Sequence, residues 1–198
     1  MSAAGPPQGA RPAGGERRAA PVGGEPSTAA PSTQLSEAAL RRIDHEVAKY
    51  PPDQKQSAVM AALAIAQDEQ GWLPPDAMDF VAKYLGMAPV AVYEIASFYA
   101  MYNTEPVGKY KITICTNLPC ALQDAVKAAE HLKAKLGIGF GETTADGLVT
   151  LKEGECFGAC GDAPVLLVNN KRMCSLMAPD KIDALLAELR AAGAGDSR

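Results

Sequence analysis

The stretch YKITICTNLPC, residues 110–120, decides the fold of this chain. Ile112 and Ile114 alternate with Lys and Thr, which predicts a strand with one apolar face. The strand ends at Cys115, and a short loop leads from it to a second cysteine, Cys120. Open α/β sheets usually hold ligands beyond the carboxyl ends of their strands, so this loop is a candidate ligand loop.

A second pair of cysteines lies in the stretch ECFGAC, residues 155–160. Cysteines this close on one loop can both turn onto a shared zinc ion or iron–sulfur cluster. A disulfide framework belongs to short secreted chains, and we see no stretch typical of a secretory signal. Neither pair has the C-x-x-C spacing of thiol exchange. The four residues Cys115, Cys120, Cys156 and Cys160 therefore predict a four-thiolate metal site.

Residues 108–192 alternate strands with helices in the order β-α-β-β-β-α, which predicts a thioredoxin-like α/β domain with a mixed four-stranded sheet. The second strand should run parallel to the first, because a strand–helix–strand connection is almost always a right-handed crossover. Both cysteine pairs would then follow neighbouring strands at one edge of the sheet. The expected strands are 110–115, 148–152, 165–168 and 172–177, and the expected helices are 121–136 and one that begins at Pro179.

The helix expected over residues 121–136 bears on the chemistry of the site. Leu122 and Val126 belong to a set of apolar residues at helical spacing, which predicts that they share one face of this helix. Cys120 is expected at the N-terminus of this helix, where the helix dipole and free N–H groups favour the thiolate that binds metal. Pro164, just before a buried strand, occupies the place where thioredoxin-like folds often keep a cis-proline.

The part of the chain before residue 108 predicts helices instead. Residues 35–107 are expected to form a helical bundle, with Ser36 as the cap of its first helix. A second helix is expected over 54–70, and first-turn prolines open two more. The two ends of the chain are expected to be a disordered low-complexity extension over 1–34, rich in Ala, Gly, Pro and Ser, and a flexible tail over 193–198.

Composition excludes several classes of function. The 19 basic residues are dispersed among 23 acidic ones with a net charge of -4, so we expect no nucleic-acid partner. No apolar run is long enough to span a bilayer, so we expect no direct membrane insertion. A G-x-G-x-x-G nucleotide turn is also missing from the sequence, so we expect no dinucleotide site of that kind in this chain.

The choice of metal is not settled by spacing, since structural zinc also takes four cysteines. The context favours iron and sulfur. Gly158 and Gly161 allow backbone N–H groups to approach sulfur atoms, and Leu118, Phe157 and Ala159 can shield a cluster from water. Zinc stays open at this point.

Both cysteine motifs, with LGI at 136–138 and GETTADG at 141–147, closely resemble the thioredoxin-like two-iron ferredoxin component of NADH:quinone oxidoreductase, the bacterial respiratory complex I. The resemblance spans about residues 35–189. It extends into the helical region through YPP at 50–52, QGWLP at 70–74, ASFY at 96–99 and PVGKY at 106–110. Members commonly have Leu where this chain has Phe157, which leaves the cysteines unchanged.

The resemblance implies that Cys115, Cys120, Cys156 and Cys160 hold a [2Fe-2S] cluster. It implies docking on a flavoprotein that binds FMN and NADH, beside further iron–sulfur subunits, with no catalytic residue in this chain itself. The expected location is cytoplasmic and peripheral to the inner membrane in a bacterium, or on the matrix side in a mitochondrion. Small diaphorase subunits of NAD-dependent hydrogenases and formate dehydrogenases have like motifs and remain an alternative. An alternative of another class is a non-redox zinc-binding interaction module.

Three other residues invite a functional interpretation and receive a structural one. Cys174 lies on the last expected strand, away from both loops, and is predicted to be a buried free thiol. His45 and His131 each lie among charged neighbours and are predicted on solvated helix faces.

Overall fold

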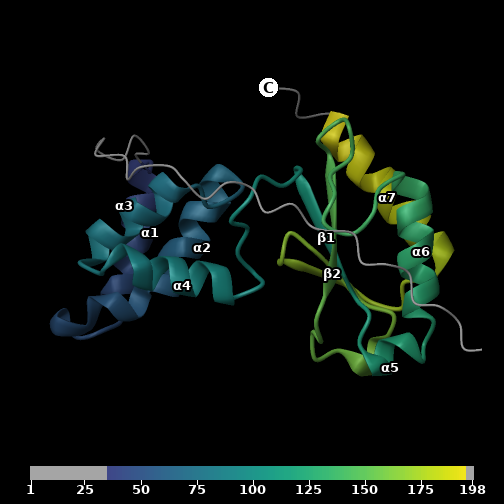
Figure 1. Cartoon of the computed structure of the whole chain (residues 1–198), viewed down its shortest axis with the longest axis horizontal. Helices are drawn as coiled ribbons and strands as arrows, with labels where there is room; N and C mark the ends of the chain where they lie inside the picture. The colour runs from purple at the N-terminus through teal and green to yellow at the C-terminus, as the bar shows by residue number, and fades with distance from the viewer. Residues whose placement is uncertain (1–34, 195–198) are drawn as a thin grey trace, which may run out of the picture. The chain divides into compact units, whose positions relative to one another are not determined.

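The computed structural model describes residues 35–194, so the extension expected over 1–34 lies outside the described part. The chain begins there with helices, drawn in purple to teal in Figure 1. None of the described helices is long and apolar enough to cross a membrane. The helical elements are α1 (Glu37–Val47), the 3-10 helix η1 (Pro52–Ala58), α2 (Val59–Gln70), α3 (Pro75–Leu85) and α4 (Pro89–Phe98).

The start of α1 is fixed by its predicted cap. Ser36 Oγ accepts a hydrogen bond from the Ala39 N–H at 3.2 Å. The same hydroxyl donates to Glu69 Oε2 of α2 at 2.6 Å, which ties the start of α1 to the end of α2. The helix expected over 54–70 is shorter than predicted, because Gln54 has non-helical φ and ψ and the chain forms η1 before α2 begins.

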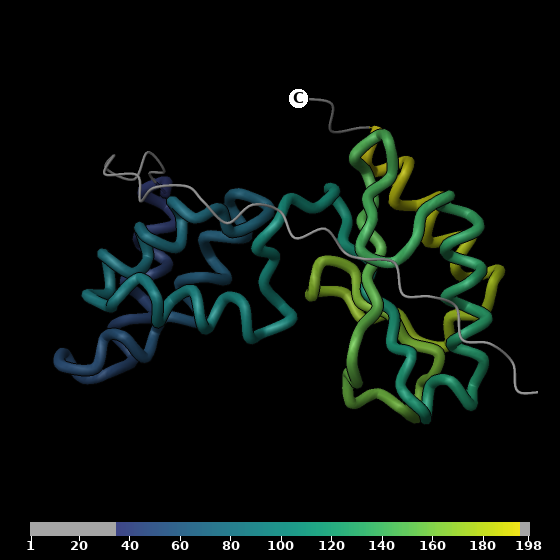
Figure 2. Tube along the Cα trace, in the orientation of Figure 1, coloured from purple at the N-terminus to yellow at the C-terminus, as the bar shows by residue number. Residues whose placement is uncertain are grey.

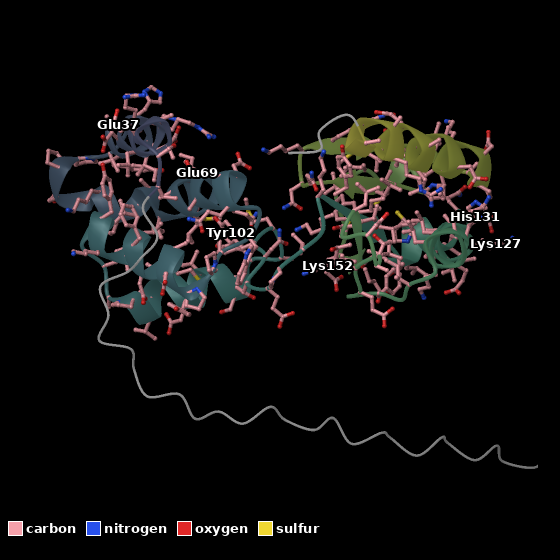
Figure 3. All side chains as sticks on the ribbon, turned by 90° about the horizontal axis from the view of Figure 1, so that it is seen from above. Glu37, Glu69, Tyr102, Lys127, His131 and Lys152 are labelled. Atoms are coloured by element: carbon pink, nitrogen blue, oxygen red, sulfur yellow. The ribbon has the colours of Figure 1, made fainter. Side chains whose placement is uncertain are left out.

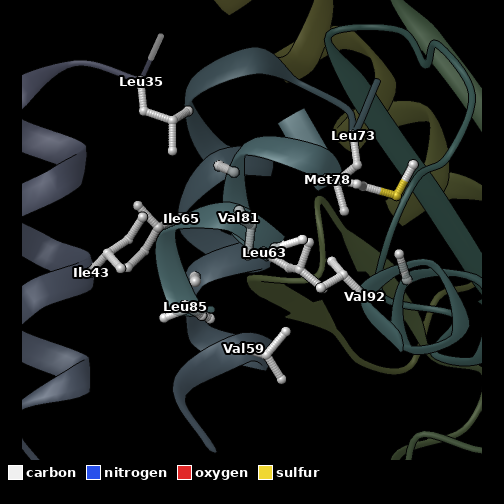
Figure 4. Close-up of a cluster of buried hydrophobic side chains, with 14 of the residues drawn as sticks. Leu35, Ile43, Val59, Leu63, Ile65, Leu73, Met78, Val81, Leu85 and Val92 are labelled. Carbon is white, nitrogen blue, oxygen red and sulfur yellow. The ribbon is translucent and has the colours of Figure 1, made fainter. Parts of the chain in front are cut away.

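The helices pack around one apolar core, shown in Figure 4. Ile43 of α1, Leu63 of α2, Leu85 of α3 and Val92 of α4 are each at most 1% exposed. Burial of a side chain of this size contributes about 1.5–3 kcal/mol to folding. These four helices share one core, which confirms the helical part of the predicted fold class.

The second half of the chain is an α/β fold. Its strands are β1 (Tyr110–Cys115), β2 (Val149–Gly154), β3 (Leu166–Val168) and β4 (Arg172–Cys174), and its helices are α5 (Leu118–Ala121), α6 (Ala125–Leu136), the 3-10 helix η2 (Cys160–Asp162) and α7 (Pro179–Ala194). The strand order is β2-β1-β3-β4, with β1 parallel to β2 and the other two pairs antiparallel. This confirms the predicted mixed four-stranded sheet. Helix α7 continues through residues 193–194, which we expected in the flexible tail.

One face of the sheet is covered by α6 and α7, which lie side by side in Figures 1 and 2. Ile112 and Ile114 of β1 point into this layer and are fully buried beside Leu132 of α6 and Ile182 of α7. The β1–β2 pairing sets Cys115 opposite Gly154, so both strands finish at the same edge. The peptide bond before Pro164 is cis, as expected.

The helix expected over 121–136 is divided in two. Helix α5 ends at Ala121, and Asp124 takes a left-handed conformation with φ of 64° before α6 begins. Asp tolerates this conformation better than most residues with a side chain. Leu122 lies in the turn between the two helices and is 75% exposed, and Val126 in the first turn of α6 is 50% exposed. Neither belongs to the buried face that Ala129 and Leu132 form.

Lys111 is a buried charge in β1, only 2% exposed. Its Nζ donates to Asn103 Oδ1 at 2.8 Å. Burial, and to a smaller extent the charge of Lys152, lowers the pKa of Lys111 from 10.5 to about 8. Burial of the protonated amine therefore destabilises the folded state, and the hydrogen bond to the neutral Asn103 oxygen offsets this only in part.

We predict that the Lys111 amine makes the unchanged chain gain stability, relative to a variant without this amine, between pH 8 and pH 10. In that range the unfolded chain binds more protons at Lys111 than the folded chain does, so raising the pH favours folding. The full effect of a shift of this size is at most about 3 kcal/mol. The difference in unfolding free energy between the unchanged chain and Lys111→Met, measured by urea unfolding at each pH, should rise across this range. The difference between the unchanged chain and Lys181→Met, on the exposed side of α7, should stay flat. A flat difference for Lys111→Met would contradict the assignment.

Candidate metal centre

The four predicted cysteines lie at the sheet edge where β1 and β2 end. Cys115 is the last residue of β1 and Cys120 lies in α5, and both are 1% exposed. Cys156 follows β2 and Cys160 opens η2, and both are exposed. The buried pair belongs to a small apolar cluster with Ala125, Ala163 and Val165, against which Phe157 and Ala159 of the second loop pack. One pair is therefore inside the protein and the other at its surface.

The second loop curls around its first cysteine. The Sγ atoms of Cys156 and Cys160 are 4.0 Å apart. The Gly158 N–H donates to Cys156 Sγ at 3.3 Å, in a turn where Gly158 has φ of 74°. A residue with a Cβ rarely adopts this φ, so glycine is what lets the N–H reach the sulfur. This is the backbone approach to sulfur that the glycine-rich sequence predicts.

Two thiols of the site, Cys120 and Cys160, have pKa values above the usual range. Burial raises the pKa of Cys120 to about 11, assisted by its hydrogen bond with Cys115 and by the charges of Cys115 and Cys160. The pKa of Cys160 is raised chiefly by its hydrogen bond with Cys156 and by the charge of Cys156, and Cys115 adds to it. The sulfur atoms thus influence one another across the two pairs. Metal binding has to release protons from these thiols, so it becomes more favourable as the pH rises.

The predicted effect of a helix dipole on Cys120 is wrong. Cys120 is the third residue of α5, which has four residues in all, and the long helix begins only at Ala125. A single turn adds little of the macrodipole that a longer helix accumulates. Burial dominates instead and favours the neutral thiol.

The donor set suits a cluster with more than one metal better than a single ion. Tetrahedral zinc needs four sulfur atoms around one point at about 2.3 Å. A two-iron cluster also takes four thiolates but spreads them over two iron atoms. Two thiol pairs on adjoining loops, shielded on one side by apolar residues, fit the second requirement.

Two hydrogen bonds join the first cysteine loop to the end of β2. Thr116 Oγ1 donates to Glu153 Oε1 at 2.6 Å, and Asn117 Nδ2 donates to Glu155 Oε2 at 3.0 Å. The sequence placed both glutamates beside the second loop but indicated no partner for them, and it singled out neither Thr116 nor Asn117. The strand register supplies the missing information, since it sets Cys115 opposite Gly154 and so brings the residues on either side together.

Gly154 provides the space in which the second loop packs. A Cβ at this position would lie 2.6 Å from Phe157 Cζ and 2.6 Å from Thr113 Cγ2. The Phe157 ring therefore lies over the end of β2, against Thr113 of β1. Without a side chain at Gly154, the ring anchors the loop that carries both exposed cysteines.

We predict that Gly154→Ala loosens this loop. The new methyl group would push Phe157 away, and overpacking of this kind costs about 1–3 kcal/mol of unfolding free energy. Gly161→Ala is the matched control, since its Cβ would meet nothing within 4 Å, and it should shift stability by less than about 0.5 kcal/mol. Urea unfolding of both variants measures the difference. Equal stability of the two would show that the Phe157 contact is not tight.

Comparison with known protein families identifies the family of this chain. The sequence profile of the thioredoxin-like [2Fe-2S] ferredoxin family matches residues 43–190. This chain belongs to that family. Its cofactor is accordingly a [2Fe-2S] cluster, and the four-thiolate donor set fits that group.

Curated relatives of this ferredoxin are subunits of an oxidoreductase. NADH-quinone oxidoreductase subunit 2 of Thermus thermophilus is 39% identical over 149 residues, covering 75% of this chain and 82% of the relative. A subunit of the NADH-quinone oxidoreductase of Rhizobium meliloti is 44% identical over 150 residues, covering 76% of this chain and 88% of the relative.

A solved structure also resembles this ferredoxin. The air-oxidised NAD+-reducing [NiFe]-hydrogenase matches with a TM-score of 0.57 and 25% identity. The match covers 66% of this chain but only 23% of the hydrogenase chain. This ferredoxin therefore corresponds to less than a quarter of the length of that chain.

The other candidate residues, Cys174 and His131, have roles in packing and in joining helices. Cys174 is 9% exposed within the core of the α/β fold, and burial raises the pKa of its thiol. His131, labelled in Figure 3, is not simply solvated as predicted. Its Nε2 lies 2.8 Å from Asp183 Oδ1, so it links α6 to α7. Lys135 and His131 together lower the pKa of Asp183.

Proposed function

We propose that this chain is an electron-transfer subunit of an NADH-oxidising complex, with its [2Fe-2S] cluster on Cys115, Cys120, Cys156 and Cys160. The observation that carries the proposal is the placement of two cysteine pairs at one sheet edge, in a chain of this family. The thiolates would hold the iron atoms as two neighbouring pairs, Cys115 with Cys120 and Cys156 with Cys160.

The bound cluster would supply storage of one electron at a time. The chain's own residues set the conditions for that storage. The Gly158 N–H donates to the Cys156 sulfur and so stabilises negative charge there. Phe157 and Ala159 pack beside the buried pair and keep water from it. Glu153 and Glu155 add negative charge nearby, which opposes reduction and lowers the potential.

The proposed electron source is the flavin of a partner protein. Hydride transfer from NADH needs a flavin, and flavins pass electrons on singly to iron–sulfur clusters. This chain has no glycine-rich nucleotide turn, so we assign FMN and NADH to that partner. Cys156 and Cys160, on the exposed loop, are the side of the site that a partner can approach. In this proposal no side chain here transfers a proton or acts as a nucleophile.

The host complex we favour is a respiratory NADH:quinone oxidoreductase, because relatives of 39% and 44% identity are subunits of an enzyme with that name. Other iron–sulfur subunits would then be neighbours, and the chain would be held at the membrane through the complex. A second candidate is the diaphorase part of an NAD-dependent hydrogenase, which the likeness to the NAD+-reducing [NiFe]-hydrogenase favours. The zinc module has no comparable support.

We predict that the anaerobically purified chain contains two iron and two sulfide ions per molecule, the composition of a cluster on four thiolates. Reduction with dithionite should give the electron paramagnetic resonance signal of one unpaired electron. Serine at any one of the four cysteines should lower the cluster content, because a hydroxyl is a poorer ligand than a thiolate. Cys174→Ser is the control and should keep the full content. A colourless protein with one zinc ion would refute the proposal.

We predict that affinity purification of the chain from its native cells recovers a protein that binds FMN. NADH should then reduce the cluster in the recovered complex but not in the isolated chain, since the nucleotide site lies on the partner. The other recovered subunits distinguish the two host complexes. Subunits of a quinone reductase would indicate the respiratory complex, and subunits of a hydrogenase would indicate the second candidate. Reduction of the isolated chain by NADH would contradict the assignment of the flavin to a partner.

A further inference from the structure

The two cysteine loops are connected by more than the sheet. Thr116 directly follows Cys115, and Glu155 directly precedes Cys156. The hydrogen bond between Thr116 and Glu153 therefore begins next to Cys115. The hydrogen bond between Asn117 and Glu155 ends next to Cys156. We call these four residues, Thr116, Asn117, Glu153 and Glu155, the loop clasp.

The placement of two carboxylates here is electrostatically unfavourable. A cluster held by four thiolates is negatively charged, and like charges nearby raise the cost of holding it. An uncharged acceptor or no acceptor would avoid that cost. Each carboxylate nevertheless accepts a bond from the opposite loop, at 2.6 Å from Thr116 and 3.0 Å from Asn117.

The clasp supplies a restraint that the strands do not. Strand β1 ends at Cys115 and β2 ends at Gly154, so the ladder stops before Cys120 and before Cys156. Phe157 holds the second loop from the side of Thr113 and Gly154. The Asn117–Glu155 bond joins the two loops directly beyond the last ladder residues, and the Thr116–Glu153 bond ties the first loop to the end of β2. The clasp thereby limits how far one cysteine pair can move from the other.

We propose that Glu153 and Glu155 are positioning residues for the metal centre, which hold the two cysteine loops at a fixed separation through Thr116 and Asn117. This rests on the proposed function, in which all four cysteines bind one cluster. The carboxylates act through their hydrogen bonds, and their charge is incidental to the holding of the loops. Residues that orient metal ligands typically change metal affinity by about 10–100-fold when they are removed.

The test separates the bond from the charge in the full-length, cluster-loaded chain. Thr116→Val removes the donor and keeps the charge of Glu153. Glu153→Gln removes the charge and keeps an acceptor oxygen, whereas Glu153→Ala removes both. The rate at which an iron chelator bleaches the cluster is measured for each variant and for the double variant Thr116→Val/Glu153→Ala. Asn117→Leu, Glu155→Gln and Glu155→Ala repeat the design for the second bond.

The proposal expects cluster loss about tenfold faster in Thr116→Val and in Glu153→Ala. The double variant should lose its cluster no faster than either single variant, because both remove the same bond. Glu153→Gln should stay within about twofold of the unchanged chain, as should the control Glu130→Gln on α6, where Glu130 pairs with Lys133. The proposal would be overturned if Glu153→Gln accelerated cluster loss as much as Glu153→Ala. It would also be overturned if the double variant showed the product of the two single-variant accelerations.

A second readout does not depend on the cluster. Hydrogen–deuterium exchange of the metal-free chain should become faster in peptides that span residues 153–162 when the clasp is broken, and should be unchanged by Glu130→Gln. Unchanged exchange in Thr116→Val and in Glu153→Ala would count against the clasp even if the loaded chain could not be made. Failure of the unchanged chain to bind iron would instead refute the proposed function, so the two failures are distinguishable.

Discussion

The parallel pairing of β1 with β2 is the constraint on which the site depends. It sets Cys115 opposite Gly154, so each strand delivers its cysteine loop at the same edge of the sheet. The pairing is stable because α6 and α7 cover one face of the sheet and bury Ile112 and Ile114. A shift of β2 by one residue would turn its buried side chains to the other face. It would also separate Thr116 and Asn117 from their glutamate partners.

The site is asymmetric in its exposure, and this has chemical consequences. Cys115 and Cys120 are embedded in an apolar cluster, whereas Cys156 and Cys160 lie on an exposed loop. Burial raises the pKa of Cys120 to about 11, so metal binding has to release a proton from this buried thiol. In the proposed function, the exposed pair would give electrons a short route to a partner protein. Apolar shielding on one side and access on the other suit a centre that exchanges electrons but not protons.

Much of the fold was predictable, because its signals are local. Alternation of apolar residues marked β1, first-turn prolines marked α3 and α4, and Ser36 marked the start of α1. The break between α5 and α6 was not predictable, because Leu122 continues the apolar spacing of the helix while lying 75% exposed. Helical periodicity records which residues could share a face, but not whether the chain stays helical between them.

The cysteine spacings by themselves predicted a four-thiolate metal site, because two cysteines this close on one loop can both turn onto a shared ion or cluster. The family resemblance around them indicated the two-iron cluster. Only the tertiary structure decided which cysteines are buried, that Gly154 makes room for Phe157, and that Glu153 and Glu155 bond to the opposite loop. These features depend on residues about 40 positions apart in the sequence, which only the strand register brings together.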